Sequence, residues 1–170
     1  MLNSTTTHLG RGGHWTEAGV IRWLDNPSWT LFTYDDDENY PGSDSKWGWH
    51  GTTSASTSNS YVIYVSDTYE SNGYKYDIWI RGSWVRGQHV PYKENKVDQA
   101  NEIWSNTGKW TPDTGKASHR SEILYEEDGT LVYWNEDIPT KWWHAPRFGC
   151  HVKESHEMYG NAWRYITWVK

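Results

Sequence analysis

Tryptophan, histidine and charged side chains lie close together in three short segments, and their types suit the recognition of a polar ligand. An aromatic ring of tryptophan combines a large apolar face with one hydrogen-bonding edge. A pyranose sugar has the matching surfaces, because an apolar face of C–H groups is surrounded by a rim of hydroxyls. The candidate ligand-binding residues are Trp79, Asp77, Arg81, Trp47, Trp49, His50, Trp142, Trp143 and His144.

Side-chain alternation decides how these candidates are presented. In the run from Tyr74 to Arg81, an extended chain places Trp79 on the same side as Asp77 and Arg81. Trp79 is then either an exposed platform or a ring packed under a second layer. In an extended segment, neighbours such as Trp142 and Trp143 point to opposite sides, so at least one of the two is expected to face out.

An acidic stretch between two predicted strands is a candidate calcium site. Ca²⁺ prefers six to eight oxygen ligands, and Asp35, Asp37, Asn39 and Asp44 offer such oxygens. The first three have the initial spacing of an EF-hand loop, but Tyr40 stands where that loop needs glycine, so the stretch is not an EF-hand. A looser calcium site and a solvated acidic turn are the two interpretations.

No enzyme or zinc motif is present in the chain. Cys150, His151 and His156 are the only local cluster of potential zinc ligands, and they match no known zinc spacing. A glycosidase needs two facing carboxylates, and the strand positions Glu17 and Glu122 are examples that the sequence alone does not pair. The single cysteine excludes an internal disulfide.

The periodicity of the chain is that of β-strands. Apolar and polar residues alternate in runs that are separated by turn-forming residues such as Asn72-Gly73, Asp128-Gly129 and Gly160-Asn161. The runs cover residues 15–24, 29–34, 61–65, 74–81, 122–125, 130–134 and 163–169. One segment, Lys96–Ser105, has the apolar spacing of a short helix.

These elements predict an all-β fold, either a single-domain antiparallel β-sandwich of jelly-roll type or a closed β-barrel. Residues 1–170 are expected to form one domain, in which 1–13 is a polar, glycine-rich candidate for a flexible N-terminal segment. Residues 128–134 and 147–149, with the closing strand 163–169, resemble the last strands of concanavalin-A-like jelly rolls. This resemblance favours the sandwich over the barrel.

Composition narrows the function. The 170 residues include 14 Trp and 12 Tyr but only 2 Phe, an aromatic set that is preferred on surfaces that are both apolar and wet. The net charge of −6 and the absence of a basic cluster argue against nucleic acid. The sequence predicts a lectin-like carbohydrate-binding protein. One alternative is an enzyme with an aromatic-lined pocket, either a glycosidase or lyase acting on a polysaccharide or an enzyme acting on a small organic substrate in a β-barrel. The other is a membrane-active protein.

The expected partners follow from the same features. They are a glycan or another small polar ligand, and single sugar contacts are weak enough that several sites or a homo-oligomer are expected. The chain has no apolar run long enough for a membrane span and no secretory leader at its start. The sequence therefore predicts a cytoplasmic protein or one released without a classical signal peptide. No cofactor is expected apart from the candidate calcium ion.

Overall fold

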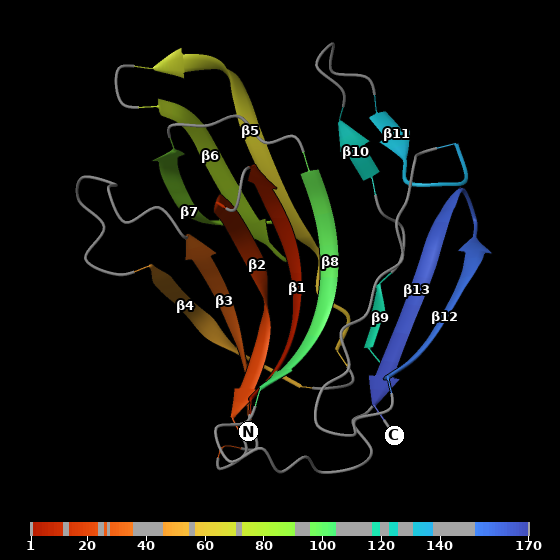
Figure 1. The fold of residues 1–170 in the computed structure, drawn as a ribbon. Coiled ribbons are helices and arrows are strands. Elements are labelled where there is room, and N and C mark those ends of the chain that lie inside the picture. The colour runs from red at the N-terminus through yellow and green to blue at the C-terminus, as the bar shows by residue number, and fades with distance from the viewer. Residues whose placement is uncertain are drawn as a thin grey trace. The chain divides into compact units, whose positions relative to one another are not determined.

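The computed structural model describes residues 2–11, 14–23, 26, 28–35, 46–54, 57–70, 73–90, 96–104, 117–119, 123–125, 131–137 and 152–169. The chain divides into two compact units, Met1–Trp104 and Ser105–Lys170. Each unit is built from antiparallel strands and is described by itself (Figure 1).

The first unit contains a five-stranded sheet in the order β4-β3-β2-β1-β8. Its strands are β1 (Leu2–Arg11), β2 (His14–Trp23), β3 (Trp29–Asp35), β4 (Trp47–Thr53) and β8 (Lys96–Trp104). The β3–β4 register shifts between Thr30 and Phe32, opposite Gly51 with its positive φ of 91°. An extra residue in β4 at this point forms a β-bulge, for which glycine is suited because it adopts positive φ without strain.

A three-stranded sheet, in the order β5-β6-β7, completes the first unit. It consists of β5 (Tyr61–Glu70), β6 (Gly73–Ile80) and β7 (Ser83–Val90). The turn between β6 and β7 is Arg81-Gly82, and both residues have positive φ, 56° and 76°. Two consecutive residues of this kind match the twist of a tight hairpin.

The second unit contains two small sheets, with the orders β12-β13-β9 and β10-β11. The strands are β9 (Ala117–His119), β10 (Ile123–Tyr125), β11 (Leu131–Tyr133), β12 (Val152–Tyr159) and β13 (Ala162–Val169). The turn between β12 and β13 contains Gly160, which has a positive φ of 67°, at the predicted Gly160-Asn161 position.

The predicted all-β class is confirmed, since the described residues contain antiparallel strands and no helix. The sheets formed by these residues are open, so the closed-barrel alternative is wrong for them. The short helix predicted at Lys96–Ser105 is also wrong. Lys96–Trp104 of this segment form strand β8, because pairing along β1 outweighs a brief helical spacing of apolar residues.

The N-terminal segment also differs from its expectation. Residues 2–11, inside the segment 1–13 that was a candidate for flexibility, form β1, which pairs with β2 on one side and with β8 on the other. The consecutive residues Thr5, Thr6 and Thr7 favour this conformation because β-branched side chains suit strands.

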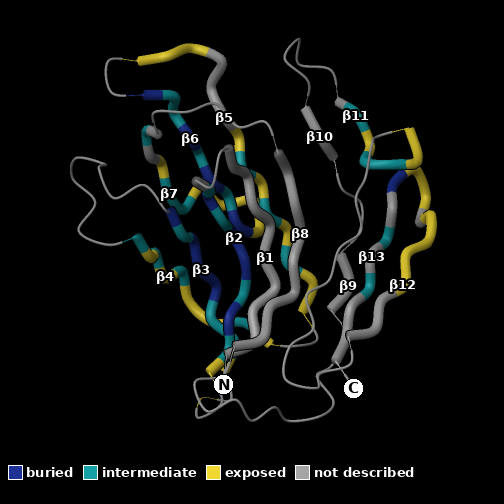
Figure 2. Tube along the Cα trace, in the orientation of Figure 1, coloured by how far each residue is buried: buried dark blue, intermediate teal, exposed yellow. Residues whose placement is uncertain are grey.

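Buried side chains lie on one face of β6, whereas β3 has buried side chains on both of its faces. Burial alternates along β6, where Tyr76, Ile78 and Ile80 are buried and the residues between them are half-buried (Figure 2). In the larger sheet, Thr33 on β3 is buried, and its hydroxyl accepts a hydrogen bond of 3.4 Å from Nη1 of Arg86 on β7. The same guanidinium nitrogen donates to the carbonyl oxygen of Lys46 at 3.0 Å. These bonds connect the two sheets of the unit.

Ile78 tests this assignment of the core. Its side chain is completely buried in β6, so the change Ile78→Ala should lower the free energy of unfolding by about 2–5 kcal/mol. Val62 on the neighbouring strand β5 is 45% exposed, so Val62→Ala should change stability by no more than about 0.5 kcal/mol. Urea denaturation of both variants measures the difference. Equal losses would contradict the assigned core face.

Candidate ligand-binding faces

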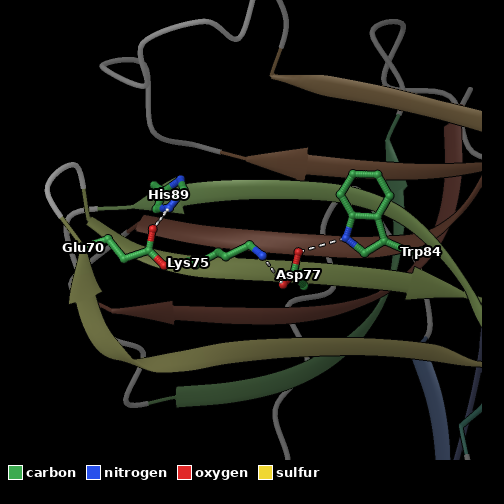
Figure 3. A network of polar contacts seen from close by, with 5 residues as sticks. All are labelled: Glu70, Lys75, Asp77, Trp84 and His89. Atoms are coloured by element: carbon green, nitrogen blue, oxygen red, sulfur yellow. Dashed lines mark hydrogen bonds and ion pairs between the residues drawn. The ribbon is translucent and has the colours of Figure 1, made fainter.

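The outer face of β6 and β7 presents an indole ring that a carboxylate holds in place. The Nε1–H of Trp84 donates a hydrogen bond of 2.9 Å to Oδ1 of Asp77, and the ammonium of Lys75 lies 3.0 Å from Oδ2 of the same carboxylate (Figure 3). Farther along the strands, His89 and Glu70 are joined at 2.8 Å. Trp84 is 58% exposed, although its ring nitrogen is hydrogen-bonded to Asp77 and its backbone pairs with that of Trp79. We call the surface formed by Lys75, Asp77, Trp84 and Gly87 the β6–β7 face.

A glycine makes room for the Trp84 ring. A Cβ atom at Gly87 would lie 3.1 Å from Cζ2 of Trp84 and 3.0 Å from Oδ1 of Asp77. The ring therefore lies across the backbone of β7 at Gly87, where any larger residue would lift it. The register of β6 and β7 shifts between Ile78 and Trp79, so that Trp84 pairs with Trp79. This bulge turns Trp84 to the side of Asp77 and away from the buried Ile78.

The predicted trio of Trp79, Asp77 and Arg81 is only partly brought together. Trp79 and Asp77 are half-buried alternate residues of β6, as expected. Arg81 lies instead in the β6–β7 turn, since its positive φ ends the strand. Its guanidinium donates to Oδ1 of Asn59 at 2.7 Å and also to the hydroxyl of Thr53. Arg81 thus ties the turn to the last residue of β4 and to Asn59, which precedes β5, and does not join the β6–β7 face.

A second aromatic surface covers one face of β2, β3 and β4, and we call it the aromatic strip. Trp47 and Trp49 stack in nearly parallel planes, with ring centroids 5.4 Å apart and an angle of 6°. Tyr34 lies 4.7 Å from Trp47, and Trp23 lies 5.4 Å from Trp49. The strip consists of Trp15, Trp23, Phe32, Tyr34, Trp47 and Trp49. Its outermost rings are Trp49, which is 51% exposed, and Trp47, which is 38% exposed.

Strand geometry places these rings together. Trp47 pairs with Tyr34, and Trp49 pairs with Phe32, and paired residues of neighbouring strands lie on the same face. Phe32 is buried beneath the two tryptophans. At the Trp15 end, its Nε1–H donates to the carboxylate of Glu17, which adds a charged group to the edge of the strip.

His50 lies on the opposite face of β4 from Trp49, as the alternation of the strand requires. Its Nε2 and the hydroxyl of Thr33 are 2.9 Å apart, and Arg86 bonds to that same hydroxyl. Burial, together with the positive charge of Arg86, lowers the pKa of His50 below its ordinary value of 6.5. His50 therefore belongs to the polar interior, separate from the two tryptophans that precede it.

Of the remaining predicted site residues, only Asp35 lies within the described part of the chain. Asp35 is a buried residue at the end of β3, and its backbone N–H donates to the carbonyl oxygen of Lys46 at 3.0 Å. The other calcium candidates Asp37, Asn39 and Asp44, and the aromatic candidates Trp142, Trp143 and His144, lie outside the described residues. Within the described part of the chain, no three His, Cys, Asp or Glu side chains converge as metal ligands. The calcium site stays a prediction.

The chain has no detectable similarity to known proteins. No family model, curated protein or solved structure matches this chain. Among the described residues, no helix has the length and apolar character needed to cross a membrane. The chemistry of the two aromatic surfaces therefore follows from their own geometry.

Sequence reasoning did not single out Trp84, the most exposed tryptophan of the described residues. A signal for it exists, because a two-residue turn at Arg81-Gly82 would place Ser83 opposite Ile80 and Trp84 opposite Trp79. This turn is hard to recognise, since arginine rarely adopts positive φ. Tyr34 and Trp23 were likewise found only through the register of β2, β3 and β4.

Gly87 provides a direct test of how Trp84 is held. The change Gly87→Ala should displace the indole and break its hydrogen bond to Asp77, because the new Cβ would come within 3.1 Å of the ring. The indole N–H resonance of Trp84, assigned by comparison with Trp84→Phe, should shift and exchange faster with solvent. Ser83→Ala, at an exposed position of the same strand, is the control. An unchanged indole resonance in Gly87→Ala would argue against this geometry.

The lowered pKa of His50 predicts that the folded protein is less stable at acidic pH. Its pKa is lowered in the folded state, so the unfolded chain binds the proton more readily. The free energy of unfolding should therefore fall as the pH drops through 6.5 and should level off below the lowered pKa. Urea unfolding at about pH 7.5 and about pH 5.5 measures this loss.

His50→Gln serves as the matched variant, because glutamine can still bond to Thr33 but does not titrate. It should lose less stability on acidification than the native chain. The same loss in both proteins would exclude His50 as its source.

Proposed function

We propose that this protein binds glycans through the β6–β7 face, with no catalysis of its own. The observation that supports this function is the Trp84 ring, which lies across Gly87, is anchored to Asp77 and leaves more than half of its surface exposed. A ring in this position offers one broad apolar face to a ligand. The C–H face of a pyranose is complementary to such a surface.

Polar groups beside the ring supply the second part of sugar recognition. Asp77 and Lys75 lie next to Trp84, and Tyr64 pairs with Asp77 across β5 and β6 with its side chain 49% exposed. The carboxylate accepts hydrogen bonds from hydroxyls, the ammonium donates them, and the phenol does both. Such groups at the rim of a stacked sugar distinguish equatorial from axial hydroxyls.

The charges of this face favour a neutral ligand. The carboxylate of Asp77 is paired with the ammonium of Lys75, so the two charges beside Trp84 offset each other. A neutral oligosaccharide loses less hydration free energy on binding here than a uronate or a sulfated sugar would, because it brings no charge to be desolvated. We therefore propose neutral, equatorially substituted pyranose chains as the ligand class.

We also propose that the two sheets of the first unit form a β-sandwich with this face on its outside. The hydrogen bonds from Arg86 to Thr33 and to the Lys46 carbonyl support this packing, as do the bonds of Arg81 to Asn59 and Thr53. In such a sandwich, the polar and apolar side chains between the two sheets would hold the β6–β7 face rigid.

Binding can be measured by calorimetric titration with cellohexaose, xylohexaose and chitohexaose. Trp84→Ala should weaken binding at this face about tenfold, since an aromatic contact contributes on the order of 1 kcal/mol beyond its buried area. Tyr133→Ala is the matched control, because Tyr133 is an exposed aromatic residue of the second unit. Absence of saturable binding to every probe would overturn the proposal, as would release of sugar product.

A further inference from the structure

The first unit carries two aromatic surfaces that point in opposite directions. Arg86 on β7 contacts Thr33 on β3, so the faces that carry these two residues are turned toward each other. Arg86 pairs with the buried Ile78, whereas Trp84 and Asp77 lie on the other side of their sheet. The β6–β7 face therefore points away from the five-stranded sheet.

The same reasoning applies to the five-stranded sheet. Thr33 and His50 lie on its inner side, where Arg86 reaches Thr33 and lowers the pKa of His50. Phe32 and Tyr34 alternate with Thr33 along β3, and they pair with Trp49 and Trp47. The aromatic strip therefore points away from the three-stranded sheet.

The aromatic strip has the properties of a second sugar-binding surface. Its rings form a continuous series of contacts that starts at Trp15 on β2, passes over β3 and β4, and returns to Trp23 at the other end of β2. A surface of this length suits several consecutive sugars of one chain better than a single sugar. Trp49 and Trp47 keep a large part of their surface exposed even though they stack on each other. Glu17 provides a hydroxyl acceptor at one end.

We infer that the protein binds two glycan chains at once, one on each outer face, and that a single molecule cross-links them. This inference rests on the proposed glycan binding and adds the second site and its direction. A short oligosaccharide cannot reach both faces, because the two sheets lie between them. Each site alone can be weak, since bridging a polymer at two points raises the apparent affinity through effective concentration.

The experiment uses the full chain and the hexasaccharide that binds among cellohexaose, xylohexaose and chitohexaose. Calorimetry should give a stoichiometry of two per chain, and Trp84→Ala and Trp49→Ala should each weaken one of the two sites about tenfold and leave the other unchanged. Light scattering with the matching soluble polymer (hydroxyethyl cellulose, arabinoxylan or glycol chitin) should rise on adding native protein. Either variant alone should abolish this rise, and excess hexasaccharide should reverse it in the native protein.

Each contrary result has a defined meaning. A stoichiometry of one that Trp49→Ala leaves unchanged would overturn the second site while the proposed function stands. Loss of all binding in either variant would contradict two independent faces, and the sugar binding that each variant retains shows that it is folded. Cross-linking only by a species that sediments as a dimer would also overturn the inference. No binding of any hexasaccharide would contradict the proposed function and the inference together.

Discussion

The contact between Arg86 and Thr33 is the interaction on which the arrangement of the first unit depends. A strand has two sides, and nothing in its hydrogen-bond ladder decides which side is covered. The Arg86 guanidinium links one side of each sheet, because it bonds to the Thr33 hydroxyl and to the Lys46 carbonyl. Trp47 and Trp49 on β4 and Trp84 on β7 lie on the faces of their sheets that do not carry these contacts.

Two bulges refine that arrangement. Without the extra residue near Gly51, the alternation of β4 would bring Thr52 to the face opposite that of Thr30, its partner on β3. Without the register shift on β7, Trp84 would not lie on the side of Asp77. The extra residue in β7 therefore determines the side of the sheet on which the exposed ring of Trp84 lies.

The sequence predicts the strands well where side chains alternate and where turns contain Asn-Gly or Asp-Gly. The strands that contain Trp29, Tyr76 and Tyr165 were expected, and each is present. The segment around Trp47 is not among the predicted strands, yet it forms β4 through pairing with β3. Pairing partners are distant in sequence, so local composition does not show them. For the same reason the sequence did not predict that Tyr34 and Trp23 lie beside Trp47 and Trp49.

The hydrogen bond from Trp84 to Asp77 also has a thermodynamic consequence for recognition. A free indole side chain samples several rotamers, and a ligand that stacks on it must restrict that motion at a cost of about 0.5–1.5 kcal/mol. Here Asp77 and the space at Gly87 restrict the ring when the chain folds. The loss of side-chain entropy is thus part of the free energy of folding, and a sugar that arrives at the ring meets a surface that is already ordered.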